Sequence, residues 1–240
     1  MITDILISAG GKGTRMKELS EHKPKHLIEV EGRPFLRYVL DNVMEAGFLH
    51  IYLVVGYKKE RIEEFAKLHT YPITFIDQFS VLPEKYGTAV PIMSAESYLA
   101  GKSFVSIAGD NYYSTRDLRI MREKHDAFTY VAGIRHEHPE RMGVLVAKAD
   151  MSLERIVEKP TEDLGNLINT SLYTFTPRVY EALNHVGKSP RGEYEITDAV
   201  SYLAKRNEVK VVELSDRWMD FGRPEDIENM KAILQNQEVK

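Results

Sequence analysis

The chain has 240 residues, of which 43% are hydrophobic and 28% charged, enough apolar material for a large buried core. Its formal net charge of -4 gives no general attraction to nucleic acid or to an anionic membrane, so we expect neither partner. The absence of Cys excludes a disulfide framework and a thiolate zinc site. No apolar run approaches the ~20 residues that span a bilayer, and no basic leader opens the chain, so we expect a cytoplasmic protein.

Strand-like and helix-like segments alternate in the first part of the chain. The expected strands are residues 5–7, 51–55, 73–76 and 104–108, and the expected helices are residues 35–45, 59–68 and 88–99. This alternation predicts a parallel sheet with helices on both faces. Ligands of such sheets bind at the carboxyl ends of the strands, so functional residues should follow the strands.

Strands predominate beyond Asp110, with little helix expected between them. The expected strands are residues 128–134, 143–147, 153–157, 167–175 and 209–214, and the expected helices are residues 177–183, 195–205 and 224–234. No internal repeat or linker interrupts the pattern. We therefore predict a single α/β domain over residues 1–240, with a Rossmann-like mixed, mainly parallel sheet flanked by helices and a small, partly antiparallel portion.

A glycine-rich turn directly follows the first expected strand. Its sequence is Ser8-Ala9-Gly10-Gly11-Lys12-Gly13-Thr14-Arg15, and Lys23-Pro24-Lys25 follows shortly afterwards. Glycines let backbone N–H groups approach phosphate oxygens closely, and the Lys and Arg side chains add positive charge. The turn has neither the Walker spacing nor the dinucleotide spacing. Taken alone, it is equally compatible with an ordinary strand-to-helix turn.

The turn and the following Pro-Lys together resemble the signature of the sugar-phosphate nucleotidyltransferases, typified by glucose-1-phosphate thymidylyltransferase. That signature is Gly-Gly-x-Gly-Thr-Arg-Leu and then Pro-Lys, and only the Leu differs here, as Met16. The resemblance implies that the turn binds an NTP and that Arg15 and Lys25 are catalytic, because they stabilise charge on the α-phosphoryl group. The NTP-binding residues implied in the turn are Ala9, Gly10, Gly11, Gly13 and Thr14.

Two aspartates resemble the metal ligands of the same family. Asp110 follows an expected strand in a Gly-Asp pair, which alone is ordinary turn chemistry, and Asp220 lies in Trp218-Met219-Asp220-Phe221-Gly222. The resemblance implies that both carboxylates bind Mg²⁺ and leave positions free for phosphate oxygens and water. The family usually continues with Gly-Thr, whereas this chain has Gly222 and Arg223, which either alters phosphate contacts or points outward.

Further segments resemble the sugar-binding half of the family. In Glu158-Lys159-Pro160, the resemblance assigns the Glu to sugar hydroxyls and the Lys to the sugar phosphate. Gly143 lies in an element like Tyr-Gly-Val, and Asn169 opens an element like Asn-x-Gly-x-Tyr in which Ser171 replaces the glycine. If that position has a positive φ, Ser171 should crowd the sugar pocket. Residues 193–198 resemble Glu-x-Glu-Ile-Thr-Asp, which is also a helix start with an acidic first turn.

The side that binds the base is less clearly marked. Gly87 and Thr88 resemble a Gly-Thr-Ala element that lies near the nucleoside and opens a helix. Thymidylyl and uridylyl relatives commonly carry a Gln five residues before this glycine, where this chain has Leu82, and Gln78 lies further back. The sequence therefore leaves the base open.

The resemblance implies transfer of a nucleoside monophosphate from an NTP to a sugar 1-phosphate, with dTTP or UTP and glucose 1-phosphate as the preferred substrates. Three alternatives stay open: guanylyl transfer to mannose or heptose 1-phosphate, suggested by residues 32–36 and 224–226; cytidylyl transfer to a non-sugar phosphate; and a regulatory subunit that binds a nucleotide sugar without turnover. Because the chain ends soon after the last expected helix, we expect no appended β-helix acyltransferase domain. The sequence also leaves a homo-oligomer open.

Overall fold

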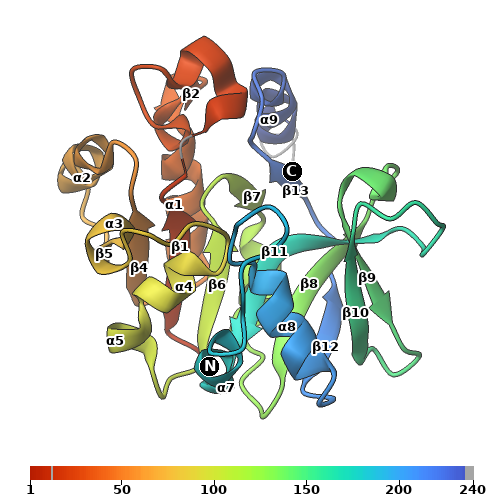
Figure 1. Ribbon diagram of the computed structural model, residues 1–240. Helices are drawn as coiled ribbons and strands as arrows, with labels where there is room; N and C mark the ends of the chain where they lie inside the picture. The colour runs from red at the N-terminus through yellow and green to blue at the C-terminus, as the bar shows by residue number, and fades with distance from the viewer. Residues whose placement is uncertain (12, 236–240) are drawn as a thin grey trace.

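A computed structural model describes residues 1–11 and 13–235 (Figure 1). In this part of the chain, nine strands form one mixed sheet in the order β10-β9-β11-β6-β1-β4-β5, with β8 paired to β11 and β12 paired to β8. The strands are β1 (Asp4–Ala9), β4 (His50–Val55), β5 (Ile73–Asp77), β6 (Phe104–Ala108), β8 (Thr129–Arg135), β9 (Gly143–Ala147), β10 (Leu153–Glu158), β11 (Leu167–Phe175) and β12 (Val209–Glu213). β1 is parallel to β4 and β6, whereas β11 is antiparallel to β6, β8 and β9. The predicted mixed, Rossmann-like sheet with an antiparallel portion is confirmed.

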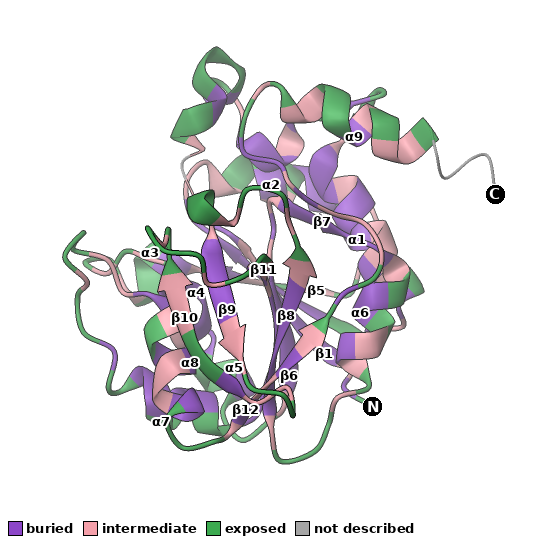
Figure 2. Ribbon diagram, turned by 90° about the vertical axis from the view of Figure 1, so that its right-hand side faces the viewer, coloured by how far each residue is buried: buried purple, intermediate pink, exposed green. Residues whose placement is uncertain are grey.

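Both faces of the sheet are buried, because the central strands are apolar without interruption. On β1, Ile5 and Ile7 pack into the core of one face and Leu6 into the core of the other, as the two-residue period of a strand requires. One face is covered by α1 (Phe35–Glu45), α2 (Lys59–Lys67), α6 (Thr115–Arg122) and α9 (Asp226–Gln235), and the other by α4 (Val90–Ser94), α5 (Glu96–Leu99), α7 (Arg178–Leu183) and α8 (Ile196–Ala204). Figure 2 shows the buried strands between these helices. None of the described helices has the length and apolar character needed to cross a membrane.

Two helical predictions were wrong. The helix expected over residues 88–99 is divided at Ala95, whose φ of -92° and ψ of 3° leave the helical region, so that α4 and α5 are separate. The region after Asp110, where little helix was expected, contains α6. Its N-cap Ser114 accepts a hydrogen bond from the backbone N–H of Asp117 at 3.1 Å, and its buried apolar residues are only Leu118 and Met121. Its residues nevertheless follow a clear amphipathic period, so the sequence contains a signal for α6 although no helix was predicted there.

Smaller elements lie above the sheet and bring distant segments together. They are the antiparallel pair β7 (Asn111–Tyr113) and β13 (Trp218–Asp220), the pair β2 (Glu29–Val30) and β3 (Arg33–Pro34), the short helix α3 (Gln78–Val81), and the 3-10 turns η1 (Thr14–Ser20), η2 (Lys25–Leu27) and η3 (Pro139–Arg141). Asp220 lies opposite Asn111, and the backbone N–H of Phe221 donates to the carbonyl of Asp110 at 2.7 Å. The β7–β13 pair therefore brings residues 110 and 220 side by side.

The ring of Phe221 anchors this pair to α1. It stacks on Phe35 with the ring centroids 4.2 Å apart and the planes at 5°, and both side chains are fully buried. We expect Phe221→Ala to lower the free energy of unfolding by about 3–5 kcal/mol, because it leaves a cavity between α1 and β13. Phe221→Leu, the matched control, should cost less than about 1.5 kcal/mol. Urea unfolding measures both values, and a loss below 1 kcal/mol for the Ala variant would contradict this account.

Candidate active site

The glycine-rich turn and Asp110 follow neighbouring parallel strands, so they emerge at the same edge of the sheet. The backbone N–H of Gly109 donates to the carbonyl of Ser8 at 2.9 Å, which ties the end of β6 to the end of β1. A Cβ on Gly109 would lie 2.8 Å from that carbonyl oxygen, so only glycine allows this close approach. The turn and the acid are therefore held together at the carboxyl ends of β1 and β6.

Lys25 pairs with Asp110 beneath the turn. The Lys25 ammonium donates to Oδ2 of Asp110, and the whole residue is only 8% exposed. Its aliphatic stem packs against Gly13, where a Cβ would lie 3.1 Å from the Cβ of Lys25 and where φ is +67°. Burial alone would raise the pKa of Asp110, but the charge and hydrogen bond of Lys25 hold it below its ordinary value. Asp110 therefore stays ionised.

Arg15 and Asp220 lie on the other side of Asp110. A Cβ on Gly222 would be 3.4 Å from both carboxylate oxygens of Asp220 and 3.5 Å from Cζ of Arg15, so these two side chains border the same glycine. Burial and the charge of Asp110 raise the pKa of Asp220 to about 6, although Arg15 and Lys25 oppose the shift. The structure thus brings the four predicted residues Arg15, Lys25, Asp110 and Asp220 into one charged cluster.

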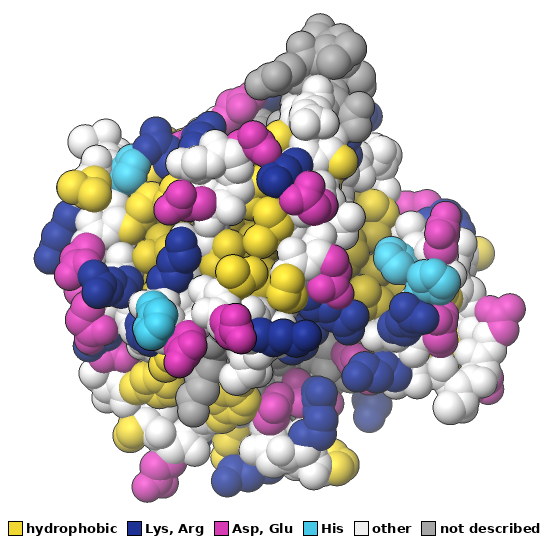
Figure 3. Space-filling view, turned by 90° about the horizontal axis from the view of Figure 1, so that it is seen from above, with side chains coloured by type: hydrophobic (Ala, Val, Ile, Leu, Met, Phe, Trp, Pro, Cys, Tyr) yellow, Lys and Arg dark blue, Asp and Glu magenta, His cyan; other side chains and the backbone are white. Residues whose placement is uncertain are grey.

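The charged cluster is exposed at Arg15 and sheltered at Lys25 and Asp110, whose side chains are 10% and 18% exposed. Seen from above, Lys and Arg side chains border a hollow that also contains acidic side chains (Figure 3). Among the described residues, no three His, Asp or Glu side chains converge as a ready-made metal site, so a cation held here would need further ligands from phosphate or water. Arg223 is not part of the cluster: its guanidinium is 62% exposed and lies 3.8 Å from Glu225.

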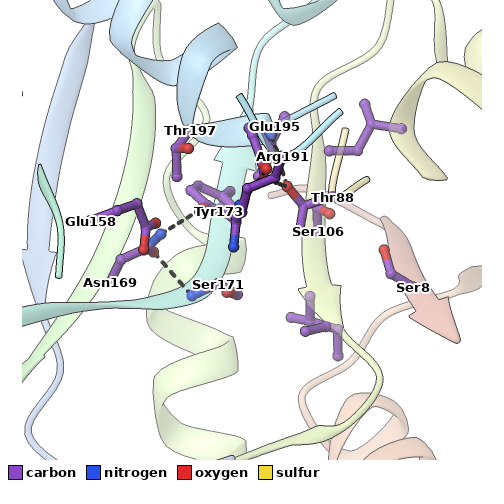
Figure 4. A pocket seen from close by; sticks show the side chains of 14 residues that line it. Ser8, Thr88, Ser106, Glu158, Asn169, Ser171, Tyr173, Arg191, Glu195 and Thr197 are labelled. Carbon is purple, nitrogen blue, oxygen red and sulfur yellow. Dashed lines mark hydrogen bonds and ion pairs between the residues drawn. The ribbon is translucent and has the colours of Figure 1, made fainter. Parts of the chain in front are cut away.

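A cavity of about 280 Å³ lies beside the ends of β1 and β6, with polar side chains from several distant segments. Those that carry chemistry are Thr88, Glu158, Asn169, Tyr173, Arg191 and Glu195 (Figure 4). Three of them, Thr88, Glu158 and Asn169, were predicted from the sequence. Asn111 and Tyr113 of β7 both donate to the carbonyl of Thr170 on β11, at 3.1 and 2.6 Å. These bonds fasten the strand that follows Asp110 to the strand that lines the cavity.

The other predicted sugar-binding residues lie at different distances from this cavity. Gly143 does not line the cavity but lies against one residue that does, because a Cβ there would be 2.9 Å from Oε1 of Glu158. Asn169 is fixed in place: its Nδ2 donates to the hydroxyl of Tyr173 at 2.7 Å. Lys159 is not among the residues that line the cavity, and its backbone N–H donates to the carbonyl of Met142.

The predicted NTP-binding residues line the edge of the sheet and the turn above it. Ala9 ends β1 and is buried, Thr14 opens η1, and a Cβ on Gly11 would meet open space. Gly87 adopts φ +131° against the backbone of Tyr194. Lys12 lies outside the described residues.

Two residues that the sequence analysis did not select also lie at the site. Gln78 is 5% exposed and packs on Gly10, where a Cβ would be 2.6 Å from its Oε1. Gln78 precedes Gly87 by nine positions rather than five, and this longer spacing concealed it. Arg191 lines the cavity and donates to Oε1 of Glu195 at 2.8 Å. Its sequence signal was its position two residues before the acidic element that begins at Glu193.

Ser171 meets the condition for crowding the cavity. Its φ is +59°, and it is one of the residues that line the cavity. Its backbone N–H donates to Oδ1 of Asn169 at 3.0 Å, where the pairing of β11 with β8 is irregular between Asn169 and Tyr173. A left-handed backbone with a side chain is strained, so the chain keeps a serine here at a cost in stability.

Comparison with known proteins identifies the family. The model of the nucleotidyl transferase family matches residues 5–237, and the chain belongs to this family. UTP–glucose-1-phosphate uridylyltransferase AglF of Haloferax volcanii is 33% identical over 239 residues, which cover 97% of this chain and 96% of the relative.

The bifunctional protein GlmU of Methanocaldococcus jannaschii is 34% identical over 225 residues, which cover 93% of this chain and 52% of the relative. The chain thus spans about half the length of this and several other curated relatives. A solved structure of UDP-glucose pyrophosphorylase complexed with UDP-glucose shares the fold, with a TM-score of 0.85 at 21% identity over 99% of this chain and 100% of the other.

The strain at Ser171 can be measured with two substitutions. Ser171→Gly removes both the side chain and the left-handed strain, whereas the matched control Ser171→Ala removes the hydroxyl and keeps the strain. We expect the Gly variant to be more stable than the Ala variant by about 1 kcal/mol in urea unfolding. Equal stabilities, or a more stable Ala variant, would show that the backbone at residue 171 is not strained.

The raised pKa of Asp220 makes stability depend on pH. Folding raises this pKa from 3.8 to about 6, so the ionised carboxylate costs stability above about pH 6, and the cost fades as the pH falls toward 4. In a chelator, Asp220→Asn should therefore stabilise the protein by about 1–3 kcal/mol at pH 8 and by less at pH 5. Asp110→Asn, whose pKa is lowered instead, should destabilise it at pH 8. Denaturant unfolding at both pH values measures this, and a pH-independent effect of Asp220→Asn would refute it.

Proposed function

We propose that this chain transfers a nucleoside monophosphate from an NTP to a sugar 1-phosphate and releases pyrophosphate. The observation that carries the proposal is the charged cluster of Arg15, Lys25, Asp110 and Asp220 beside a cavity rich in hydroxyl, amide and carboxylate groups. The similarity to a UTP–glucose-1-phosphate uridylyltransferase over nearly the full length of both chains supports it.

The NTP would lie over the glycine-rich turn. Backbone N–H groups of a turn with little side-chain bulk can surround phosphate oxygens, and Gly13 gives the turn its left-handed bend. Arg15 offers a planar fork to the phosphates, and Lys25 offers a point charge. Both cations would stabilise the charge that develops around the α-phosphorus and on the departing pyrophosphate.

Asp110 and Asp220 fit the requirements of Mg²⁺. The mutual repulsion of the two carboxylates contributes to the raised pKa of Asp220, so a divalent cation between them would relieve an existing electrostatic cost. A pair of carboxylates also leaves positions for phosphate oxygens and water, which is how Mg²⁺ is usually held. Bound there, Mg²⁺ would offset the repulsion between the two anionic substrates.

The sugar 1-phosphate would occupy the cavity. Glu158 and Asn169 can bind sugar hydroxyls, and Arg191 can supply positive charge for the phosphate. The family resemblance assigns Lys159 to the same phosphate, although Lys159 does not line the cavity. An oxygen of the sugar phosphate attacks the α-phosphorus, and the bond to the β-phosphate breaks as pyrophosphate leaves. No protein nucleophile is needed, so positioning and charge carry the reaction.

Gln78 offers a contact for the base. Its amide has both a donor and an acceptor, and it is buried against Gly10 and Gly56. Because every nucleobase presents donors and acceptors, this amide does not by itself select one base. The similarity to a UTP–glucose-1-phosphate uridylyltransferase carries the choice, so we propose UTP or dTTP, with glucose 1-phosphate, as the preferred substrates.

A pyrophosphate-release screen of the four NTPs and dTTP against a panel of sugar 1-phosphates tests the proposal. UTP or dTTP with glucose 1-phosphate should give the highest kcat/KM. Faster turnover of GTP with mannose or heptose 1-phosphate would move the assignment to guanylyl transfer, and CTP with a non-sugar phosphate would move it to cytidylyl transfer. No turnover with any pair, together with tight binding of a nucleotide sugar, would reject the enzyme.

The metal assignment has its own test. Asp110→Asn should reduce Mg²⁺-dependent kcat by at least about 100-fold, since it removes a ligand and the partner of Lys25. Asp150→Asn is the matched control, because Asp150 is an exposed acid that accepts hydrogen bonds from Ser152 of its own turn and does not line the cavity. Circular dichroism checks that both variants fold. Unchanged turnover in the Asp110 variant would reject its role.

A further inference from the structure

Two turns that contribute to the cavity lining, residues 86–89 and residues 193–195, are joined by backbone hydrogen bonds. The N–H of Tyr194 donates to the carbonyl of Tyr86 at 2.8 Å, and the N–H of Ala89 donates to the carbonyl of Tyr194 at 2.9 Å. Between these bonds, Gly87 adopts φ +131°, and a Cβ there would lie 2.3 Å from the carbonyl oxygen of Tyr194. Glycine is therefore required at this contact, and the two turns form one unit.

Glu195 continues the connection through side chains. It is 8% exposed, and its Oε2 accepts a hydrogen bond from the hydroxyl of Thr88 at 3.2 Å. Its Oε1 accepts from Arg191 at 2.8 Å and from Ser189 at 3.3 Å. The hydroxyl of Thr88 also accepts from the backbone N–H of Ile196 at 2.9 Å, so its proton is directed to Glu195. Figure 4 shows Glu195 between Thr88 and Arg191.

The hydrogen bonds form a chain from Thr88 through Glu195 to Arg191, and the two ends of this chain of bonds differ in how firmly they are held. Thr88 is fixed by the backbone contacts of its turn, whereas the side chain of Arg191 is 63% exposed. A long, exposed Arg samples many rotamers unless a partner holds it. Because Glu195 is the buried partner of Arg191, the orientation of the guanidinium over the cavity depends on Glu195.

We propose that Glu195 is a positioning residue that couples nucleotide binding at Gly87 and Thr88 to the placement of Arg191 over the sugar 1-phosphate. The inference rests on the proposed function, which puts the sugar 1-phosphate in the cavity beside Arg191, and on the nucleotide-binding role that the family resemblance gives Gly87 and Thr88. A nucleotide that contacts the fixed turn of Thr88 would strengthen the bond from the Thr88 hydroxyl to Glu195 and hence hold Arg191 in one orientation. The coupling is reciprocal, so each substrate tightens the binding of the other by the same factor.

Calorimetric titration measures this coupling directly. The sugar 1-phosphate selected by the screen is titrated into the protein with and without the α,β-methylene analogue of the matching NTP, which cannot transfer. In the wild type, the analogue should tighten sugar 1-phosphate binding by about 5–50-fold. In Glu195→Gln, this factor should fall to nearly one, and the KM for the sugar 1-phosphate should rise more than the KM for the NTP.

Two further variants separate positioning from a general loss of structure. Thr88→Val keeps the pair of Arg191 and Glu195 but removes the link, so it should abolish the coupling. Because Thr88 also lines the cavity, the coupling factor is taken as the ratio of the two sugar 1-phosphate affinities measured on this same variant, with and without the nucleotide analogue. Thr88→Ser retains the hydroxyl and should retain the coupling. Glu137→Gln, an exposed acid that is not among the residues lining the cavity, is the control and should behave as the wild type.

Two results would overturn the inference: a wild-type coupling factor near one, or a wild-type factor retained by Glu195→Gln. Either result would leave the proposed function standing if the wild type turns over in the parallel assay. Absence of wild-type turnover with every substrate pair would instead overturn the proposed function and, with it, the inference.

Discussion

The interaction on which the site depends is the ion pair of Lys25 and Asp110. A carboxylate at the sheltered end of β6 stays ionised only with a cation in contact, and Lys25 reaches it by packing its stem along Gly13. Gly13 therefore leaves room for the lysine that pairs with Asp110, and it also leaves room for a phosphate bound above the turn. The pKa of Asp220 is instead raised, first by burial and then by the charge of Asp110. A cation or a phosphate-bound metal beside Asp220 would reduce the electrostatic cost of its buried negative charge.

The change from parallel to antiparallel pairing creates the second half of the site. β6 has the parallel β1 on one side and the antiparallel β11 on the other, so the irregular stretch of β11 from Asn169 to Tyr173 lies beside the ends of the parallel strands. Polar groups on β11 then face a cavity rather than a neighbouring strand. The bonds from Asn111 and Tyr113 to Thr170 fix the distance between the charged cluster and this cavity.

Short sequence patterns were sufficient to predict the buried strands and the glycine-rich turn, because these features depend on residues close together in the sequence. Uninterrupted apolar runs such as residues 51–55 and 104–108 predict buried parallel strands, because both faces of such strands are covered. The turn from Gly10 to Arg15 and the two aspartates could likewise be selected, because their chemistry depends on residue type at short spacing. α6 was not predicted, although the spacing of its buried Leu118 and Met121 fits an amphipathic helix.

The residue pattern alone thus established the fold class, the family resemblance and the identity of the four charged residues. Their convergence was decided by tertiary structure, since β13 carries Asp220 to Asp110 only when Phe221 stacks on α1. The sequence named Gln78 and the element that contains Glu195, but the contacts of Gln78 with Gly10 and of Glu195 with Thr88 became visible only in space. Their partners Gly10 and Thr88 lie far away in the sequence, and no spacing rule covers contacts made between separate loops. The roles of these residues follow from their burial and their contacts across the edge of the sheet, and both depend on the folding of the whole chain.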